Sequence, residues 1–495
     1  MCSIASRFEG FPSRRYPSSG RKSIFVRWLC LLAVVLLVGA TPVKSDLLLL
    51  AAQSSGSPWR FHIVSRIAGT QTQVDEEGET VVTRRCRGVV CQGTVVNAAR
   101  ARVSFFWYNE TPVLQSTELD PLQTTLRAIV SYAFTSPAFT ANGGTVVALA
   151  QRRMGDAEVA PYAVTAPHGA ELDALLDTAS GLLVGVAQGH DAIYRYEDQR
   201  RVGPLMLPFN ISRGDGTSET FEDRRVVDTP LIAPSGPPVT FARGHETLAL
   251  EAGILPRFPC RIENVVARCV LDTGAPGLAM SLDLADQLGK KLVGEMELEG
   301  LGTMSSGVVR ADSLTLGSMR IGPALFAILP DVGGFGADVI VGSDAIARAI
   351  VHVDPQHRTI AFDPPGSQIE GTHVPLTFDG FTPSVPIRLE GSAENFVLDT
   401  GDNASIDLSK EFARARPDLI VTKARTNIVG VGGVATRAVG HIGQVEFAGI
   451  SLTNVLADVT NAPRSPASRV GSAFLSHFAF DLDYTELRMS VRPPR

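Results

Sequence analysis

The sequence contains one short segment twice, and that segment could do chemistry. Val-Leu-Asp-Thr-Gly stands at residues 270–274 and again at residues 397–401, which places Asp272 and Asp399 in the same setting 127 residues apart. A single Asp-Thr-Gly occurs by chance in roughly one chain in ten of this length and means little alone, but two copies, each after Val-Leu, are highly specific. Each copy predicts a carboxylate at the end of a strand, on a tight turn where glycine lets the backbone approach closely and threonine offers a hydroxyl. Such carboxylates are candidates for general acid–base catalysis.

A longer repeat surrounds these two turns and must position them. Three blocks of sequence match in the same order at nearly one spacing: 259–274 with 386–401, 339–343 with 468–472, and 351–354 with 480–483. Chance does not account for three matches in one order, so the second half of the chain is predicted to hold two copies of one fold.

The two copies resemble the pepsin/retropepsin superfamily of aspartic proteases, in the form of bacterial proteins with tandem retropepsin-like lobes. The resemblance is carried by the two Asp-Thr-Gly turns and by an apolar-apolar-Gly element after each, at residues 340–342 and 469–471. It covers about residues 245–490. It departs from the family pattern at Asp402, where a small or hydroxyl residue is usual, and at Arg469, where an aliphatic residue is usual.

The resemblance implies a catalytic site. Asp272 and Asp399 would meet on a pseudo-dyad, share one proton and activate a water that attacks a peptide carbonyl. Four residues would support the dyad: Thr273, Gly274, Thr400 and Gly401. Asp402 would either raise the pKa of the dyad or point outward. No metal or other cofactor is implied.

Glycine-rich hairpin tips lie at matching places between turn and apolar-Gly element. They occupy residues 300–304 and 430–434. We interpret them as two short flaps that cover the substrate; ordinary surface hairpins remain the alternative, since such turns are common. The flap residues singled out are Gly302, Thr303, Met304, Gly432 and Gly433.

The N-terminus resembles an export signal. Basic residues precede a short apolar run, residues 28–40, and small residues follow it. Residues 1–45 are therefore predicted to be a signal peptide, with an uncleaved membrane anchor as the alternative. A periplasmic or secreted location follows, or tethering through this segment alone.

Four cysteines remain after such a signal: Cys86, Cys91, Cys260 and Cys269. An even number in an exported chain predicts two disulfides, with three connectivities open. The repeat favours one of them. A two-residue loop at Gly391-Ser392 transfers to residues 264–265 of the first copy and sets Cys260 opposite Cys269. Local spacing alone suggests the bridge between Cys86 and Cys91.

Alternating apolar and polar residues dominate the rest of the chain and predict strands, for example at residues 94–104 and 128–133. Helical patterns are few: residues 282–288, 409–415 and a weaker one at 170–176. The predicted fold class is mainly β, with two closed retropepsin-like β-barrel lobes in tandem after an antiparallel β-sheet domain.

The predicted domains are a signal or anchor (1–45), an N-terminal β-rich domain (46–235), a first lobe (236–365) and a second lobe (366–495). A cluster of Pro, Gly and Ser at residues 233–239 separates the front domain from the lobes. Part of the front domain faintly resembles the curved sheets of periplasmic lipoprotein carriers. An apolar-ligand cradle and a plain structural or propeptide-like domain are both open there.

Composition limits the partners. The net charge of −6, without a basic block beyond the N-terminus, argues against nucleic acid. The sequence thus predicts an exported aspartic endopeptidase that acts on polypeptides and works as a monomer, since one chain carries both aspartates. Two alternatives stay open: a non-catalytic binding or scaffold protein of the same fold, and a ligand carrier that works through its N-terminal domain.

Overall fold

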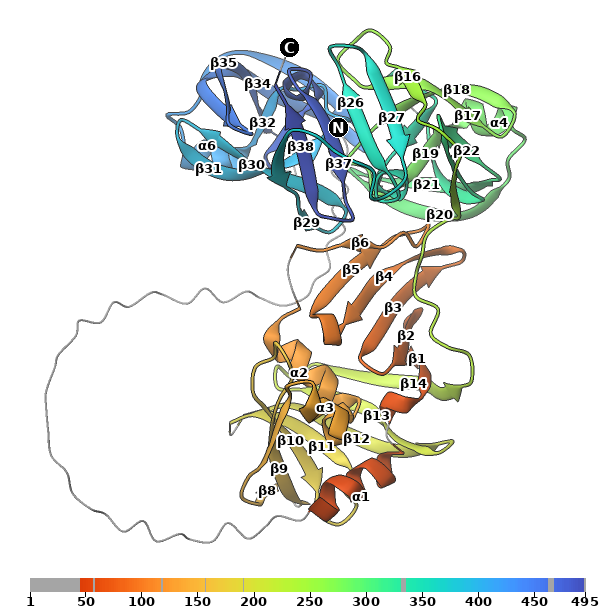
Figure 1. Cartoon of the computed structure of the whole chain (residues 1–495), viewed down its shortest axis with the longest axis vertical. Coiled ribbons are helices and arrows are strands. Elements are labelled where there is room, and N and C mark those ends of the chain that lie inside the picture. Colours follow the sequence, from red (N-terminus) through yellow and green to blue (C-terminus); the bar gives the residue numbers. More distant parts are fainter. Residues whose placement is uncertain are drawn as a thin grey trace, which may run out of the picture.

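The computed structural model describes residues 45–493, apart from residues 57, 117–118, 156, 190, 331–334 and 462–466. The predicted export signal therefore lies almost wholly outside the described residues. The chain is mainly β, as predicted (Figure 1). No helix within the described ranges is long and apolar enough to cross a membrane.

The front part of the chain forms one 14-stranded antiparallel sheet, again as predicted. In spatial order its strands are β6 (Val113–Leu114), β5 (Arg102–Phe106), β4 (Val90–Asn97), β3 (Thr80–Arg87), β2 (Thr72–Glu77), β1 (His62–Ile67), β14 (Ser218–Val227), β13 (Leu205–Arg213), β12 (Asp191–Val202), β11 (Leu183–Gln188), β10 (Leu172–Asp177), β9 (Ala157–Thr165) and β7 (Thr145–Ala148), with β8 (Arg152–Met154) beside β9.

Helices cover part of this sheet. The elements are α1 (Ser45–Ser55), η1 (Pro58–Arg60), η2 (Ala98–Arg100), α2 (Pro121–Val130), η3 (Ala133–Thr135) and α3 (Pro137–Ala141). α2 packs against β9, β10 and β11, and α1 against β13 (Figure 1).

Two sequence-based assignments in this region are wrong. Residues 170–176 lie mostly in strand β10, whose residues Leu172–Leu176 are all buried; a short apolar run of this kind does not distinguish strand from helix. Residues 128–133 are not a strand but the end of α2 and the start of η3. The helix begins after Asp120, whose side chain accepts a hydrogen bond from the amide of Leu122 (2.8 Å), with Pro121 in the first turn.

The two C-terminal copies each form a curled sheet. The first contains β15 (Val239–Phe241), β23 (Met319–Ile321), β22 (Leu314–Leu316), β17 (Arg257–Ile262), β18 (Val265–Leu271), β25 (Val339–Val341), β19 (Leu278–Ser281), β24 (Ala324–Leu329), β21 (Thr303–Ala311) and β20 (Leu292–Glu299). The second contains β29 (Thr377–Asp379), β30 (Thr382–Leu389), β31 (Ser392–Asp399), β36 (Arg469–Gly471), β32 (Ile406–Ser409), β35 (Ile450–Asn461), β34 (Gly433–Phe447) and β33 (Val421–Gly430).

These sheets are not the two closed barrels that the sequence suggested. Among the described strands the first sheet is an open path, while a two-pair contact between β30 and β34 brings the second back on itself. Four short helices complete the copies: α4 (Leu282–Gln287), α5 (Ser343–Ile346), α6 (Lys410–Ala415) and α7 (Ser472–Leu475). α4 and α6 confirm the two stronger helix predictions.

A third sheet joins the copies. It contains β16 (Thr247–Ala249), β27 (Thr359–Asp363), β26 (Ile350–Asp354), β37 (Ala479–Asp483), β38 (Arg488–Arg492) and β28 (Thr372–Pro375). β26 from the first copy pairs with β37 from the second. One hydrophobic core therefore runs through both copies.

Both predicted disulfides are present, although the predicted hairpin register is wrong. The two-residue turn lies at Glu263-Asn264 and not at Asn264-Val265, because Ile262 pairs with Val265. Cys260 and Cys269 are therefore diagonal neighbours, with Cα atoms 5.8 Å apart, and still form a disulfide. Cys86 and Cys91 stand directly opposite each other on β3 and β4 and form the second.

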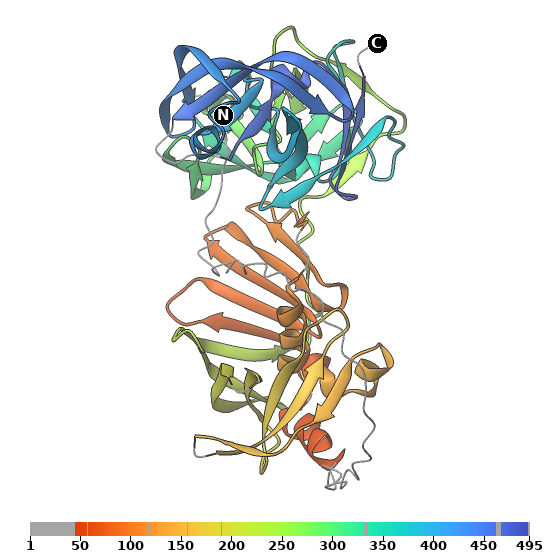
Figure 2. The ribbon, with the colours of Figure 1, turned by 90° about the vertical axis from the view of Figure 1, so that its left-hand side faces the viewer.

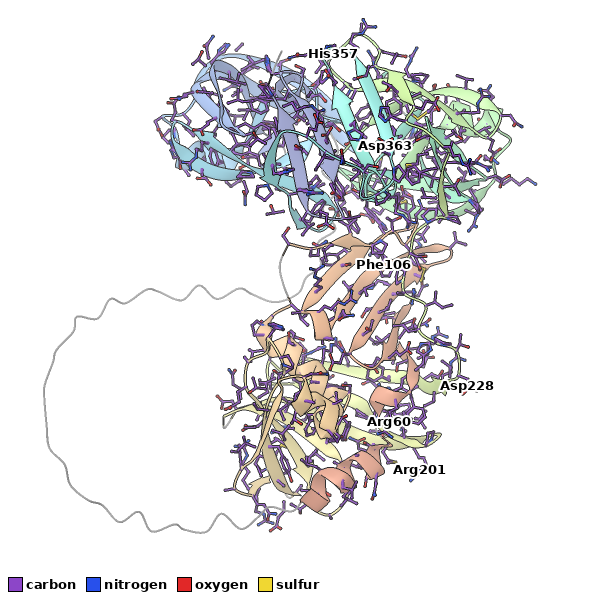
Figure 3. All side chains as sticks on the ribbon, viewed as in Figure 1. Arg60, Phe106, Arg201, Asp228, His357 and Asp363 are labelled. Carbon is purple, nitrogen blue, oxygen red and sulfur yellow. A yellow bond between two sulfur atoms is a disulfide. The ribbon has the colours of Figure 1, made fainter. Side chains whose placement is uncertain are left out.

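The front domain contacts both copies where β5 ends. Phe106 lies at the end of the front sheet that faces the C-terminal half (Figure 3), and that half stands on this end of the sheet (Figure 2). Trp107 stacks on Phe381 of the second copy, with ring centroids 5.5 Å apart. The hydroxyl of Tyr108 donates to the carbonyl of Leu278 in the first. The same hydrophobic core includes Trp107 and Tyr108.

Candidate active site

The two Asp-Thr-Gly turns follow the strands that the repeat predicted. β18 ends directly before Asp272 and β31 ends at Asp399, and both aspartates are fully buried. In each turn the glycine amide donates to the aspartate two residues earlier. The distance from the Gly274 nitrogen to Oδ1 of Asp272 is 2.9 Å, and that from the Gly401 nitrogen to Oδ1 of Asp399 is 3.1 Å.

The turns face each other so closely that only glycine fits. A Cβ atom on Gly274 would lie 2.6 Å from Oδ1 of Asp399, and one on Gly401 would lie 2.5 Å from Oδ1 of Asp272. Real Cβ atoms do not approach other atoms to such distances. The glycines thus allow each turn to pack against the carboxyl group of the other, which brings the two aspartates together as a pair.

The two threonines lock the turns together. The amide of Thr273 donates to Oγ1 of Thr400, and the amide of Thr400 donates to Oγ1 of Thr273, both at 3.0 Å. Each hydroxyl also donates to a carbonyl of the opposite strand: Thr273 to Leu398 at 2.6 Å and Thr400 to Leu271 at 2.8 Å. Four buried hydrogen bonds related by approximate two-fold symmetry therefore fix the separation of the aspartates.

The apolar-Gly elements form the floor beneath the turns. β25 runs parallel to β18 and β36 runs parallel to β31. A Cβ atom on Gly342 would lie 2.5 Å from the carbonyl oxygen of Ala275, and one on Gly471 would lie 2.6 Å from that of Asp402. Close backbone packing against the two Asp-Thr-Gly turns explains the glycine in both elements.

Burial shapes the acidity of the pair. Burial raises the pKa of Asp272 to about 7, and the adjacent Asp399 adds to the rise. Oδ2 of Asp272 has no hydrogen-bond partner within the part of the chain that the structure describes. A proton held at this pair at mildly acidic pH is what acid–base chemistry on a water would need.

The two predicted flaps meet tip to tip. The hairpin β20–β21 carries Gly302 at its tip, with Thr303 and Met304 at the start of β21. The hairpin β33–β34 turns at Val431 and Gly432, with Gly433 next. The amide of Gly302 donates to the carbonyl of Val431 at 3.2 Å.

A small apolar cavity of about 20 Å³ lies between the flaps and Asp272. Its lining includes Val431 from the turn of the β33–β34 hairpin and Leu298 from β20 of the other hairpin. It also includes Tyr108 from the front domain, a contribution that sequence patterns did not reveal. Both hairpins thus border a cavity that Asp272 also lines.

The front domain supports this site through Asn109. Its Nδ2 donates to Oδ2 of Asp344 at 2.6 Å and to the carbonyl of Leu325 at 2.9 Å, and its Oδ1 accepts from the Leu325 amide at 2.7 Å. Burial raises the pKa of Asp344 to about 6, while the hydrogen bond from Asn109 lowers it. Asp344 follows the apolar-Gly element of the first copy, so the front domain holds an element of the site.

The two departures from the family pattern point inward and form ion pairs. Asp402 is buried, which excludes the outward orientation, and Arg469 contacts Oδ2 of Asp399 at 3.1 Å through Nη1. Three further buried charges accompany them: Arg437, Asp407 and Asp458. These three residues were not predicted from the sequence, although Asp407 and Asp458 stand at strand positions that hold alanine in the first copy, which was a visible signal.

The first copy matches a known protein family in sequence. Residues 258–345 match the family model described as aspartyl protease. This segment contains Asp272, the first flap and the first apolar-Gly element. No curated protein matches the chain in sequence.

Proposed function

Because residues 258–345 form an aspartyl protease family domain, we propose that the chain is an exported, single-chain aspartic endopeptidase whose dyad is Asp272 and Asp399. The observation that carries the proposal is the symmetric lock between Thr273 and Thr400, which sets two buried carboxyl groups against each other. One chain supplies both turns, so the proposed enzyme acts as a monomer on polypeptides.

The proposed reaction needs only a water and one shared proton. One carboxylate takes a proton from the water as the water oxygen bonds to the peptide carbonyl carbon, and the protonated partner gives its proton to the carbonyl oxygen. When the C–N bond breaks, the amide nitrogen takes a proton from the dyad. One hydroxyl group of the tetrahedral intermediate returns its proton to the dyad at the same time, so a carboxylic acid and an amine leave and the dyad again holds one proton.

The surroundings support this chemistry. The flap tips close over Asp272, and a covered site strengthens the electrostatic interactions inside it. The turn glycines allow each turn to pack directly against the carboxyl group of the other, which keeps the two carboxyl groups adjacent. The two disulfides support export, because such bonds persist in oxidising compartments.

Cleavage of a peptide library, mapped by mass spectrometry, tests the proposal. Wild type should cut, while Asp272→Asn and Asp399→Asn should each lose at least about a hundredfold in rate. The exposed Asp283, replaced by Asn, is the matched control and should cut like wild type. Near-wild-type cleavage by either dyad variant with a native melt would contradict the proposal. An intact wild type that binds peptides without cutting them would favour the scaffold alternative.

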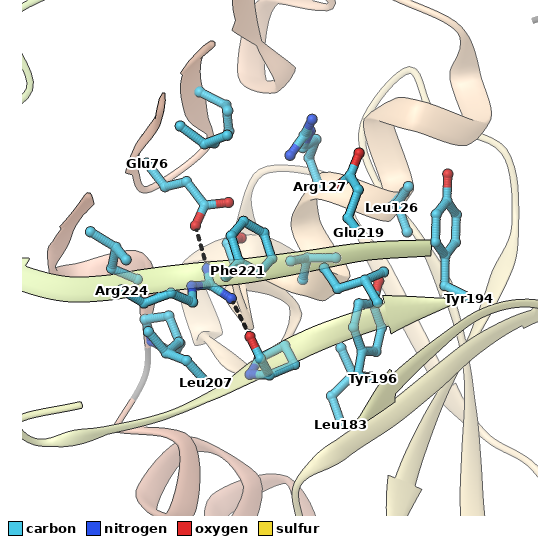
Figure 4. A pocket seen from close by; sticks show the side chains of 18 of the residues that line it. Glu76, Leu126, Arg127, Leu183, Tyr194, Tyr196, Leu207, Glu219, Phe221 and Arg224 are labelled. Carbon is cyan, nitrogen blue, oxygen red and sulfur yellow. Dashed lines mark hydrogen bonds and ion pairs between the residues drawn. The ribbon is translucent and has the colours of Figure 1, made fainter. Parts of the chain in front are cut away.

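A pocket in the front domain favours a second function, ligand binding. A cavity of about 280 Å³ lies between the front sheet and α2. Its lining is largely apolar and aromatic, and includes Leu126, Tyr194, Tyr196, Leu207 and Phe221 (Figure 4). Pockets of this size and character are typical of small-molecule sites.

Charged groups in this pocket favour an apolar ligand with an acidic group. Arg224 is paired with Glu76 at 2.9 Å and donates to the carbonyl of Pro208 at 2.8 Å (Figure 4). Arg127 also lines the pocket and has no carboxylate within 4.0 Å among the described residues. One arginine therefore remains to meet an anion.

The fluorescent anion anilinonaphthalene sulfonate, displaced by a long-chain fatty acid, tests this second function. Met206→Trp should abolish binding by filling the pocket, whereas Val147→Trp, at an exposed position outside it, should not. Equal binding by both variants, or no binding by wild type, would contradict it.

A further inference from the structure

The two copies differ sharply at one place beside the dyad. In the first copy, Ile340 of β25 pairs with Val270 and Ala279. In the second copy, the strand pairing places Arg469 of β36 opposite Val397 and Asp407 in the same way. Val270 and Val397 both stand two residues before an aspartate of the dyad. Arg469 therefore replaces an aliphatic side chain in the floor of one half-site.

Charged residues of the second copy also replace apolar residues of the first at the neighbouring positions. Ala279 pairs with Ala327 in the first copy, and Asp407 pairs with Asp458 in the second. The amides of Ala275 and Asp402 donate to the carbonyls of Asp272 and Asp399 at 3.2 and 3.1 Å, which makes these two positions equivalent as well. The four apolar residues Ala275, Ala279, Ala327 and Ile340 thus correspond to Asp402, Asp407, Asp458 and Arg469.

All four of these charges are buried, so they are costly unless they compensate one another. Arg437 supplies the second positive charge. It contacts Asp458 at 2.8 Å and Asp402 at 3.4 Å. Asp407 accepts from the hydroxyl of Thr460 at 2.7 Å. Arg437 and Thr460 therefore make the shortest contacts with the acids of the cluster.

Arg469 is left directed at the dyad. Its Nη1 donates to Oδ2 of Asp399 at 3.1 Å, while its Nε lies 3.9 Å from Asp407 and 4.0 Å from Asp402. Its side chain is 5% exposed, so water screens this ion pair little. Asp272 has no such cation: no arginine or lysine lies within 4.0 Å of it in the described ranges.

We propose that Arg469 breaks the symmetry of the dyad by holding Asp399 as the carboxylate and leaving the shared proton on Asp272. The assignment rests on the proposed endopeptidase function for its mechanistic meaning. In the reaction, Asp399 accepts the proton of the attacking water, and Asp272 donates its proton to the carbonyl oxygen. Arg469 touches neither substrate nor water and is a positioning residue.

The other titratable groups around the dyad agree with this assignment. Burial raises the pKa of Asp272 to about 7, with Asp399 adding to the rise. Burial alone would lower the pKa of Arg469, but Asp399, Asp402 and Asp407 together raise it, so the guanidinium keeps its charge. Burial raises the pKa of Tyr484 well above its usual value, and the dyad adds to this, so the phenol stays neutral.

Two acids of the cluster, Asp407 and Asp458, have raised pKa values, whereas that of Asp402 is lowered by Arg469 and Arg437 against the effect of burial. Burial raises the pKa of Asp407 to about 6 against the opposing effect of Arg469, and burial also raises the pKa of Asp458. Protonation of these two acids as the pH falls leaves more of the positive charge of Arg469 and Arg437 to Asp399. The ion pair at the dyad is therefore strengthened in the acidic range.

A direct test is carboxyl titration followed by ¹³C NMR on full-length protein with labelled aspartate. The signals of Asp272 and Asp399 are assigned from their loss in the two Asp→Asn variants. As the pH falls from 8, we expect the Asp272 signal to change first and Asp399 to remain a carboxylate. Protonation of Asp399 first, or of both together, would overturn the proposal.

Variants at residue 469 supply the second arm. Arg469→Ile installs the residue of the first copy. It should shift the acid limb of the pH–rate profile to higher pH by at least one pH unit. Arg469→Lys keeps the positive charge and should return the acid limb to its wild-type pH. A purely structural role would lower the rate without moving the limb, and that outcome would overturn the proposal.

Because Arg469→Ile leaves acids without a partner and could unfold the protein, a compensated variant is needed. It combines five changes: Asp402→Ala, Asp407→Ala, Arg437→Met, Asp458→Ala and Arg469→Ile. It should fold and should show the same shift of the acid limb. The experiments distinguish a failure of the proposed peptidase function from a failure of the proton assignment. A wild type that cuts no peptide but in which Asp272 is protonated before Asp399 would refute the peptidase function and not the proton assignment.

Discussion

His352 and Asp481 lie 129 residues apart in sequence and face each other across β26 and β37, with Nδ1 of the histidine 2.9 Å from Oδ1 of the aspartate. This spacing is that of the repeat, so the two residues occupy the same position in the two copies. On either side of this contact, Val351 pairs with Leu482 and Val353 pairs with Phe480. The repeat makes Val351 equivalent to Phe480 and Val353 equivalent to Leu482, so exchanging the two copies turns one of these pairs into the other. A local two-fold axis therefore passes through this contact, as another passes between Thr273 and Thr400.

The threonine lock should be measurable as stability. Thr273→Ala removes a hydroxyl that accepts from the Thr400 amide and donates to the Leu398 carbonyl, leaving both buried and without a partner. We expect the free energy of unfolding to fall by about 2 kcal/mol or more. Chemical denaturation measures this, with Thr273→Ser, which keeps the hydroxyl, as the control. An equal loss in both variants would show that the methyl group and not the lock matters.

The repeat is why so much of this site could be predicted from sequence. Asp272, Thr273 and their counterparts were identified because two weak motifs at equivalent positions make one strong one. The same comparison identified Arg469 as a departure from the aliphatic Ile340 of the first copy, but it did not predict the role of this arginine, which depends on Asp399, a partner 70 residues away. Contacts between strands distant in sequence leave no local pattern.

The front domain was harder to predict for a different reason. Its apolar run at Leu172–Leu176 is buried on both faces, so it lacks the alternation that marks a half-exposed strand. The contacts of Tyr108 and Asn109 with the first copy could not be foreseen, since a Tyr-Asn pair in a loop has no distinctive pattern. The start of α2, in contrast, had a readable signal in Asp120-Pro121.

Disulfide removal should destabilise the protein modestly. The bridge between Cys260 and Cys269 closes a short loop, for which chain entropy gives about 2–3 kcal/mol. The double variant Cys260→Ser, Cys269→Ser should therefore unfold at lower denaturant concentration under oxidising conditions. Adding a reductant should shift wild type toward the variant and leave the remaining difference small. An unchanged midpoint in the variant would contradict this expectation.

Stability should fall as the pH rises through the neutral range. Burial raises the pKa of Asp272 to about 7, whereas an unfolded aspartate ionises near pH 4. Between these values the folded state binds a proton that the unfolded state lacks, so this contribution is complete below about pH 4 and is lost as the pH rises through 7.

Asp272→Asn removes this titration. Its free energy of unfolding should depend less on pH between 4 and 7 than that of wild type, and Asp283→Asn should behave like wild type. Denaturant titrations at pH 4, 5.5 and 7 measure the difference. Parallel pH dependence in wild type and Asp272→Asn would refute the expectation.

The complete site should lie within one molecule. Both aspartates and both threonines of the lock come from a single chain. The specific activity should stay constant on dilution, and light scattering should report one chain per particle at every concentration that is active. A specific activity that falls in step with the dissociation of a dimer would show that the dyad forms between chains.

The front domain should support activity and not inhibit it. Asn109→Ala leaves the Leu325 amide and the buried Asp344 without their partner, in an element that packs beneath the turn of Asp272. We expect peptide cleavage to fall about tenfold and the melting temperature to drop, because a lost hydrogen bond to a buried carboxyl costs about 1–3 kcal/mol. Asn142→Ala, at an exposed position of the same domain, should change neither. An inhibitory propeptide predicts the opposite sign, so an increase in activity on Asn109→Ala or Tyr108→Phe, with the fold intact, would decide against a supporting role.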